Sequence, residues 1–250
     1  MIFFMQGFDK MFGGVFAAAV LVFAVLGCSQ FGNVPSEGAI PGTYDAAVTG
    51  VENKGRRFDL TFERNGKLFD VKWSEAGTNF VGKAVYMGDY LGVTFAEEGS
   101  DAVCGTMFYR SFGPQAISGY SAVLGKENFG SETLTRTNGK GFEGEFGVYG
   151  RSVEGSDYSG TLSIKKNGEQ YDATWQIGEK QADGIGYVWG NLLAVVFGDG
   201  SCRFAVYRND RGFFESSDVV RFTGKLGDMN GFSSDLLINK RSAVRSAGGE

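Results

Sequence analysis

The stretch NGKLFDVKW at residues 65–73 decides the fold, because the chain carries it a second time as NGEQYDATW at residues 167–175. The register of the two copies holds without a gap to Phe95 and Phe197. A unit of this length is too long for a solenoid repeat and long enough to be a small domain. We therefore predict a tandem pair of homologous domains.

The match extends in both directions from this stretch. Upstream, Tyr44 corresponds to Phe146, and downstream Tyr109 corresponds to Tyr207. Further on, FGSETL at residues 129–134 returns as FSSDLL at residues 232–237. The predicted organisation is a first barrel repeat at 42–136, a linker at 137–143, a second barrel repeat at 144–239 and a polar tail at 240–250.

The N-terminal region is predicted to be a targeting segment. Residues 11–27 carry no charge and are dominated by Ala, Val, Phe and Leu, which is typical of a signal peptide. The sequence VLGC at residues 25–28 resembles a bacterial lipobox, so we predict a signal peptide over 1–27, acylation of Cys28 and a tether over 28–41. Such a protein would be lipid-anchored at the bacterial outer membrane or in the periplasm. An uncleaved anchor and ordinary secretion are the alternatives.

The composition favours an all-β protein with many short strands. The chain has 40 Gly and only 3 Pro, together with 23 Phe and 10 Tyr. Segments such as FDLTFE at 58–63 alternate apolar and polar residues, and Asn65-Gly66 and Asn167-Gly168 indicate hairpins. Each repeat has room for eight such runs, so we predict two tandem antiparallel up-and-down β-barrels.

A family resemblance rests on the second repeat. The segments YDATW at 171–175, GIG at 184–186, GNLLAV at 190–195 and VY at 206–207 resemble a family of small exported bacterial β proteins. Its units are described as lipocalin-like or avidin-like barrels, and some members are labelled fibronectin-binding. The resemblance implies a barrel fold and a binding role, and it implies no catalytic residue. The chain departs from the family pattern at 117–120 and 222–225, which places the seventh strand of the second repeat in question.

The residue types exclude several kinds of catalytic site. The sequence contains no histidine, which excludes Ser-His and Cys-His dyads and His-ligated metals. Two carboxylate positions recur, Asp70 with Asp172 and Glu132 with Asp235. Asp70 and Asp172 alternate against apolar neighbours, so we expect these acids to point away from the core and to serve solvation or turns. We therefore predict that the protein is not an enzyme and that it binds no metal ion or cofactor.

Aromatic side chains are the candidates for ligand binding. A barrel interior lined by Trp73, Trp175 or Trp189 could stack on a small apolar or aromatic ligand, with Tyr171 or Tyr187 supplying a hydroxyl. Plain core packing of these rings is the commoner outcome in a barrel of eight strands. Trp189 has Met87 as its counterpart, so the second repeat is the better candidate.

Cys104 and Cys202 occupy equivalent positions in the two repeats. A disulfide between them requires the same strand of each repeat to meet across a pseudo-twofold axis. Both residues are in phase with apolar neighbours, so we expect free buried thiols.

The formal net charge of −5 and the lack of a basic stripe argue against nucleic acid as a partner. We therefore expect a non-enzymatic binding or adhesion module, with a protein partner or a small ligand. A carrier of apolar ligands, or a structural or inhibitory envelope protein, is the alternative.

Overall fold

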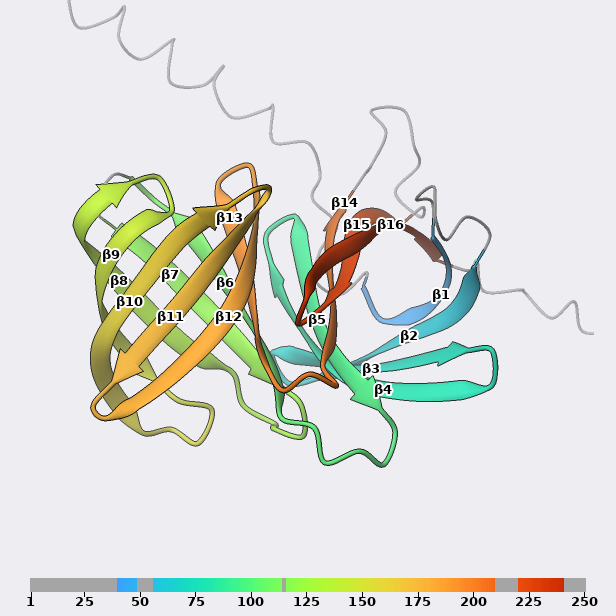
Figure 1. The fold of residues 1–250 in the computed structure, drawn as a ribbon. Helices are drawn as coiled ribbons and strands as arrows, with labels where there is room; N and C mark the ends of the chain where they lie inside the picture. The colour runs from blue at the N-terminus through green and yellow to red at the C-terminus, as the bar shows by residue number, and fades with distance from the viewer. Residues whose placement is uncertain (1–39, 49–55, 114–115, 210–219, 241–250) are drawn as a thin grey trace, which may run out of the picture. The chain divides into compact units, whose positions relative to one another are not determined.

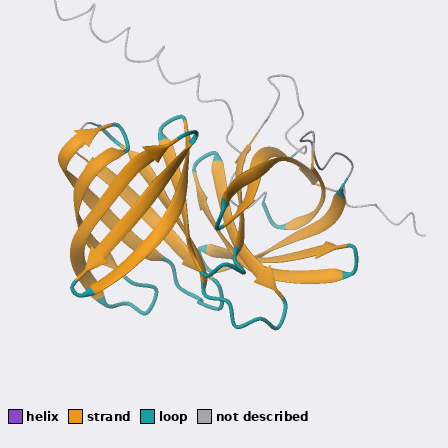
Figure 2. Ribbon diagram, viewed as in Figure 1, coloured by secondary structure: helices purple, strands orange, loops and turns teal. Residues whose placement is uncertain are grey.

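The computed structural model describes residues 40–48, 56–113, 116–209 and 220–240. The predicted signal peptide, Cys28 and most of the tether therefore lie outside the described residues, as do 241–250. Within the described ranges every regular element is a β-strand (Figure 2), and no helix there is long and apolar enough to cross a membrane.

The described residues form sixteen strands, eight in each repeat. They are β1 (Gly42–Val48), β2 (Arg57–Asn65), β3 (Leu68–Glu75), β4 (Thr78–Met87), β5 (Tyr90–Glu97), β6 (Cys104–Ser111), β7 (Ala116–Val123), β8 (Gly130–Lys140), β9 (Glu143–Arg151), β10 (Asp157–Asn167), β11 (Gln170–Ile177), β12 (Lys180–Trp189), β13 (Leu192–Gly198), β14 (Arg203–Asn209), β15 (Arg221–Asp228) and β16 (Gly231–Lys240). The seventh strand of the second repeat, questioned above, is present as β15, which pairs with β14 and β16.

The strands form two closed antiparallel barrels of eight strands each, which confirms the predicted fold class. One barrel consists of β6 to β13 in chain order, drawn from green to orange in Figure 1, and we call it the continuous barrel. The other consists of β1 to β5 completed by β14 to β16, the blue-to-green and red strands, and we call it the split barrel.

The prediction that each repeat closes its own barrel is wrong. The first five strands of each repeat pair with the last three strands of the other, through β5 with β14 and β13 with β6. The two repeats thus exchange their last three strands within one chain, as domain-swapped protomers exchange identical elements. Because the repeats are homologous, the sequence pattern of strand six does not specify which barrel it completes.

The connections explain where the exchange takes place. Residues 98–103 carry the chain from the split barrel to the continuous one, and residues 199–202 carry it back. By contrast, the predicted linker at 137–143 is no boundary, because β8 and β9 pair across it from Ser131 with Arg151 to Lys140 with Glu143. The junction between the repeats is therefore a hairpin inside the continuous barrel.

A disulfide joins the two crossing segments, so the expectation of free thiols is also wrong. Cys104 and Cys202 are bonded, with their Cα atoms 5.4 Å apart, and both are buried. The reason is the strand exchange, which brings the equivalent ends of the two repeats together at the crossings. This is the pseudo-twofold geometry that pairing requires.

The two Asn-Gly segments lie at hairpins, as predicted. Gly66 and Gly168 take the first loop position with φ of 59° and 63°, which a glycine adopts without a Cβ penalty. The preceding asparagines donate to the recurring aspartates, Asn65 to Asp70 at 2.8 Å and Asn167 to Asp172 at 3.0 Å. Asp70 and Asp172 therefore stabilise turns.

The barrels meet through an apolar seam of buried side chains from both. In β5, a Cβ on Gly92 would lie 2.3 Å from the ring of Phe108 in β6, so only glycine admits this approach. The equivalent position to Gly92 is Ala194, which belongs to the same cluster. The complete set of buried residues in the seam is Leu68, Val85, Phe108, Ala122, Leu192, Ala194 and Val206.

Candidate functional site

The interior of the split barrel is filled by stacked aromatic rings. The indole of Trp73 stacks on Phe58 with centroids 4.0 Å apart and on Phe95 at 4.7 Å. Phe80 meets Phe95 edge-on at 6.0 Å. All four side chains are buried, so here the expectation of plain core packing is met.

The continuous barrel lacks two of these rings. Trp175 pairs with Ala182 in the register in which Trp73 pairs with Phe80. Likewise Gly160 lies opposite Val148, as Phe58 lies opposite Ala46. Glycine and alanine therefore replace two phenylalanine rings at the same end of the barrel.

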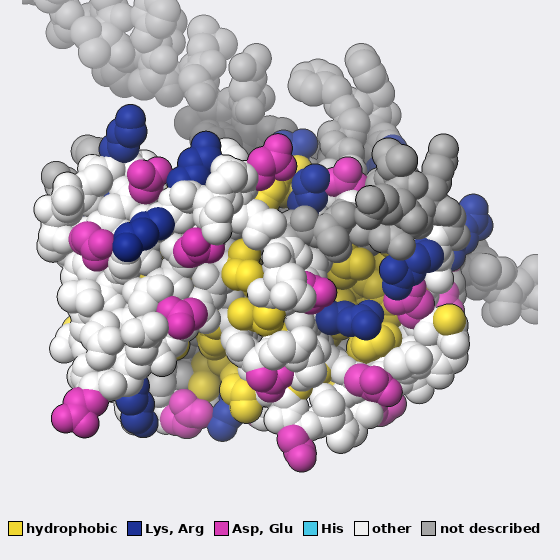
Figure 3. Space-filling view, in the orientation of Figure 1, with side chains coloured by type: hydrophobic (Ala, Val, Ile, Leu, Met, Phe, Trp, Pro, Cys, Tyr) yellow, Lys and Arg dark blue, Asp and Glu magenta, His cyan; other side chains and the backbone are white. Residues whose placement is uncertain are grey.

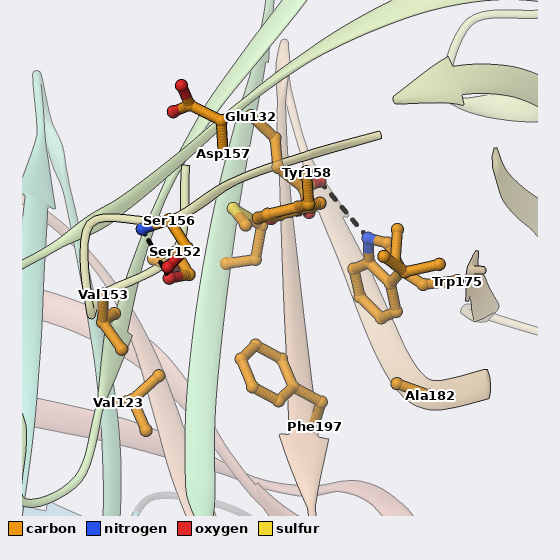
Figure 4. Close-up of a pocket in the computed structure, with 13 residues that line it drawn as sticks. Val123, Glu132, Ser152, Val153, Ser156, Asp157, Tyr158, Trp175, Ala182 and Phe197 are labelled. Carbon is orange, nitrogen blue, oxygen red and sulfur yellow. Dashed lines mark hydrogen bonds between the residues drawn. The ribbon is translucent and has the colours of Figure 1, made fainter. Parts of the chain in front are cut away.

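A cavity of about 390 Å³ lies beside Ala182, where the split barrel has the Phe80 ring. At Gly160 the space is filled instead, because a Cβ there would lie 2.6 Å from Cδ1 of Ile177. Trp175 and Phe197 form one wall, with their rings edge-to-face at 5.9 Å, and Ala182 lies beside them (Figure 4). Residues 152–156, which connect β9 to β10, contribute Ser152, Val153 and Ser156. Since these lie in a hairpin loop and Ala182 is exposed, the cavity opens at this end of the barrel.

The opposite end of the barrel is closed. Phe142, in the hairpin between β8 and β9, is buried and packs into the core cluster that holds Phe146 and Trp175. In the split barrel Ile40 is the equivalent residue, and its carbonyl accepts a hydrogen bond of 2.6 Å from the Tyr44 hydroxyl. Each barrel is thus plugged at one end by a residue that lies just ahead of the first strand of a repeat, Ile40 ahead of β1 and Phe142 ahead of β9.

A buried carboxyl group forms the polar part of the cavity. Glu132 in β8 is only 5 % exposed, and its carboxylate accepts hydrogen bonds from three side chains on three other strands. Tyr109 of β6 donates to Oε2, and Tyr158 of β10 donates to Oε1 at 2.6 Å. The Trp175 indole of β11 donates to Oε2 at 3.3 Å and to the Tyr109 hydroxyl oxygen at 3.2 Å. Figure 4 shows Glu132, Tyr158 and Trp175 at the cavity. This Glu132 network fixes the rings that line the cavity.

The network shifts the pKa values of its members. Burial raises the pKa of Glu132 above its ordinary value, although the three hydrogen bonds oppose the shift. Burial, together with the neighbouring Glu132 carboxyl group, raises the pKa values of Tyr109 and Tyr158 above that of free tyrosine. Both phenols therefore stay protonated and act as donors at neutral pH.

In the described part of the split barrel, no carboxyl group stands at the position equivalent to Glu132. The pairing of β14, β15 and β16 places Leu236 at the register position of Glu132, because a bulge between Leu226 and Gly227 shifts the strand by one residue. Accordingly, Trp73 Nε1 and the Tyr207 hydroxyl, the counterparts of Trp175 and Tyr109, have no hydrogen-bond partner in the described structure.

The sequence alignment of Glu132 with Asp235 is therefore wrong by one position. Asp235 is exposed and pairs with Lys225 at 2.5 Å. Unlike Asp70 and Asp172, the recurring acid Glu132 points into the core. A sequence signal existed, because Glu132 is two residues from Leu134 and so lies on the same face of the strand.

The predicted binding residues are divided among several places. Trp175 lines the cavity, whereas Trp73 is enclosed in the packed split barrel. Tyr171 is half-buried and packs against the core of the continuous barrel without lining the cavity. The signal that sequence reasoning missed was the change from Phe58 and Phe80 to smaller residues.

Trp189 and Tyr187 lie away from the cavity. Trp189 packs at the seam against Tyr90 of the split barrel, with centroids 6.2 Å apart, and the Arg208 guanidinium lies 4.9 Å from its ring centre. Tyr187 meets Trp189 edge-on at 6.3 Å. This pair therefore contributes to the contact between the barrels.

Comparison with known proteins gives no relative for this chain: no family model, no curated protein and no solved structure matches it. Within the described ranges, no group of three or more acidic or cysteine side chains is placed to hold a metal ion. On the face drawn in Figure 3, acidic and basic side chains are intermixed.

Proposed function

We propose that this protein is a non-enzymatic binding protein that takes a small, mainly apolar ligand into the continuous barrel. The observation that carries the proposal is the cavity of about 390 Å³ between Trp175, Phe197 and the Glu132 network. Its volume lies within the usual range for small-molecule sites, roughly 300–1,000 Å³. An apolar wall with a few convergent polar groups is the common composition of such sites.

The comparison of the two barrels supports this proposal. The same fold in the same chain is filled at the equivalent place by Phe58 and Phe80, so the open interior is a property of particular residues. The sequence left both adhesion and ligand carriage open, and the cavity favours carriage. Acylation at Cys28 would hold the carrier at the bacterial envelope, and mass spectrometry of the mature N-terminus tests that part.

The test fills the cavity with the aromatic side chain that the split barrel has at the equivalent position. In the mature chain, Ala182→Phe places a ring where the split barrel has Phe80, so binding of the neutral fluorescent dye N-phenyl-naphthylamine should be lost. Ligand binding to the native state also raises the melting temperature, and this rise should disappear in the variant.

Gln181→Phe is the matched control. It adds the same ring to the adjacent, exposed position of β12, whose side chain points to the other face of the strand. This variant should bind the dye as the unmodified chain does. Equal dye binding by the Ala182→Phe protein, with its fold intact by circular dichroism, would place the site elsewhere and contradict the proposal.

A further inference from the structure

The carboxyl group in the cavity has no cationic partner. None of the residues that line the cavity is a lysine or an arginine, and the described structure places no cation at ion-pair distance from Glu132. The other acidic residue that lines the cavity is Asp157, the first residue of β10, at the mouth of the cavity. Its carboxylate pairs with the guanidinium of Arg151 at 3.7 Å. The charge on the cavity wall is therefore acidic.

Glu132 is held by neutral donors and still has room for another. A carboxylate has roughly four lone-pair sites on its two oxygens. Oε2 accepts from Tyr109 and Trp175, whereas Oε1 accepts from Tyr158 alone. A ligand with an N–H or O–H group could donate to Oε1 without displacing any member of the network.

The nature of that donor follows from the burial of the carboxyl group. An ionised carboxylate out of water is costly unless it is paired, and a cationic donor compensates the cost better than a neutral one. The rings of Trp175 and Phe197 add to this preference, because aromatic faces attract ammonium groups and their apolar area suits the rest of the molecule. A carboxylate or phosphate ligand would instead face two acids.

Resting on the proposed function, we infer that the ligand of the continuous barrel is a small organic amine. Its ammonium group pairs with the Glu132 carboxylate, and its apolar or aromatic body lies against Trp175 and Phe197. The Glu132 carboxylate selects an amine, and the space beside Ala182 limits the size of the apolar body.

The experiment compares ligands of one shape and different charge on the full mature chain. Phenethylamine, phenethyl alcohol and phenylacetate share an aromatic body and differ in the end group, and their affinities can be measured by calorimetry. We expect phenethylamine to bind at least roughly tenfold more tightly than the alcohol, which is a modest value for a close charge pair. Phenylacetate should bind least.

Two variants separate charge from shape. Glu132→Gln should reduce the preference for the amine over the alcohol to near unity while alcohol and dye binding persist. Tyr158→Phe keeps the carboxyl group and removes the donor to Oε1, so it should retain the preference for the amine. Circular dichroism and thermal unfolding establish that each variant is folded.

The outcomes distinguish this inference from the proposed function. Amine and alcohol bound equally, or an amine preference that survives Glu132→Gln, would overturn the amine inference and leave the cavity a binding site. Loss of the amine preference in Tyr158→Phe as well as in Glu132→Gln would assign selection to the network geometry and overturn the role of charge. If neither the dye nor any of the three compounds binds, the proposed function fails, and the amine inference with it.

Discussion

At the scale of single residues, one buried acid distinguishes the two barrels. Glu132 accepts hydrogen bonds from Tyr109 and Trp175. Their counterparts, Tyr207 and Trp73, have no hydrogen-bond partner in the described part of the chain. An unsatisfied buried polar group costs roughly 1–3 kcal/mol. In the split barrel, two buried polar groups carry this cost, and stacked aromatic rings fill the interior. In the continuous barrel, the equivalent groups form hydrogen bonds, and a cavity remains.

We predict that Glu132 makes the stability of the protein depend on pH. Its pKa in the folded state is raised above the ordinary value of 4.5. In the unfolded chain Glu132 has its ordinary pKa. At pH values between this pKa and the raised pKa of the folded state, Glu132 is protonated in the folded protein and ionised in the unfolded chain. The free energy of unfolding therefore falls as pH rises through this range. The titratable groups around Glu132 are Tyr109 and Tyr158, which stay neutral there, and Asp157 at the mouth.

The measurement is urea unfolding of the mature chain and of Glu132→Gln at several pH values from 4.5 upward. The free energy of unfolding of the unmodified chain, minus that of the variant, should decrease as pH rises through the window. Subtracting the variant removes contributions from the other acids. A difference that stays level or increases with pH would contradict a raised pKa.

At the scale of elements, equivalent hairpins of the two repeats differ in backbone strain. The loop between β3 and β4 begins with Ala76 at φ 49°, and the equivalent loop between β11 and β12 begins with Gly178 at φ 59°. Left-handed backbone costs a residue with a Cβ roughly 1–2 kcal/mol and costs glycine little. The first repeat thus carries strain that the second avoids.

We predict that Ala76→Gly stabilises the protein by about 0.5–1 kcal/mol, because relief of strain exceeds the added flexibility of the unfolded chain. The matched reverse change, Gly178→Ala, should destabilise it by a similar amount. Nothing lies within 4 Å of a Cβ at Gly178, so the backbone angle alone is tested. Denaturant unfolding measures both values, and two changes of the same sign would refute the explanation.

At the scale of the whole molecule, one barrel is inserted into the other. All eight strands of the continuous barrel lie between Cys104 and Gly198, and its first and last strands pair with each other. The split barrel is interrupted at that point and resumes at β14. The Cys104–Cys202 disulfide ties the chain together where it leaves and re-enters the split barrel.

The corresponding prediction compares two fragments. Residues 104–198, with Cys104→Ser to remove the free thiol, should form a monomeric β protein with a cooperative thermal transition. Residues 144–239 contain one sequence repeat but strands of both barrels, so this fragment should not fold cooperatively as a monomer. Circular dichroism with light scattering checks both; a cooperatively folded monomer of 144–239 would show that a repeat can close its own barrel.

Part of the proposed binding site was readable from the sequence. Trp175 was a candidate, and the small residues Gly160 and Ala182 stand in the alignment against Phe58 and Phe80. The role of Glu132 was not recognised, because its donors Tyr109 and Trp175 come from different repeats and meet only through the strand exchange. Trp189 was a candidate because its counterpart Met87 is not aromatic, yet it packs at the seam between the barrels.

The sequence by itself determined the all-β class, the repeat with the eight strands of its first copy, and the two Asn-Gly hairpins. These features depend on local properties, namely period-two alternation and glycine at loops that need positive φ. The tertiary structure alone decided which strands close which barrel, the disulfide and the position of Glu132 among its donors. The physical reason is that alternation specifies which face of a strand is buried but not which edge it pairs with, and homologous repeats offer interchangeable edges.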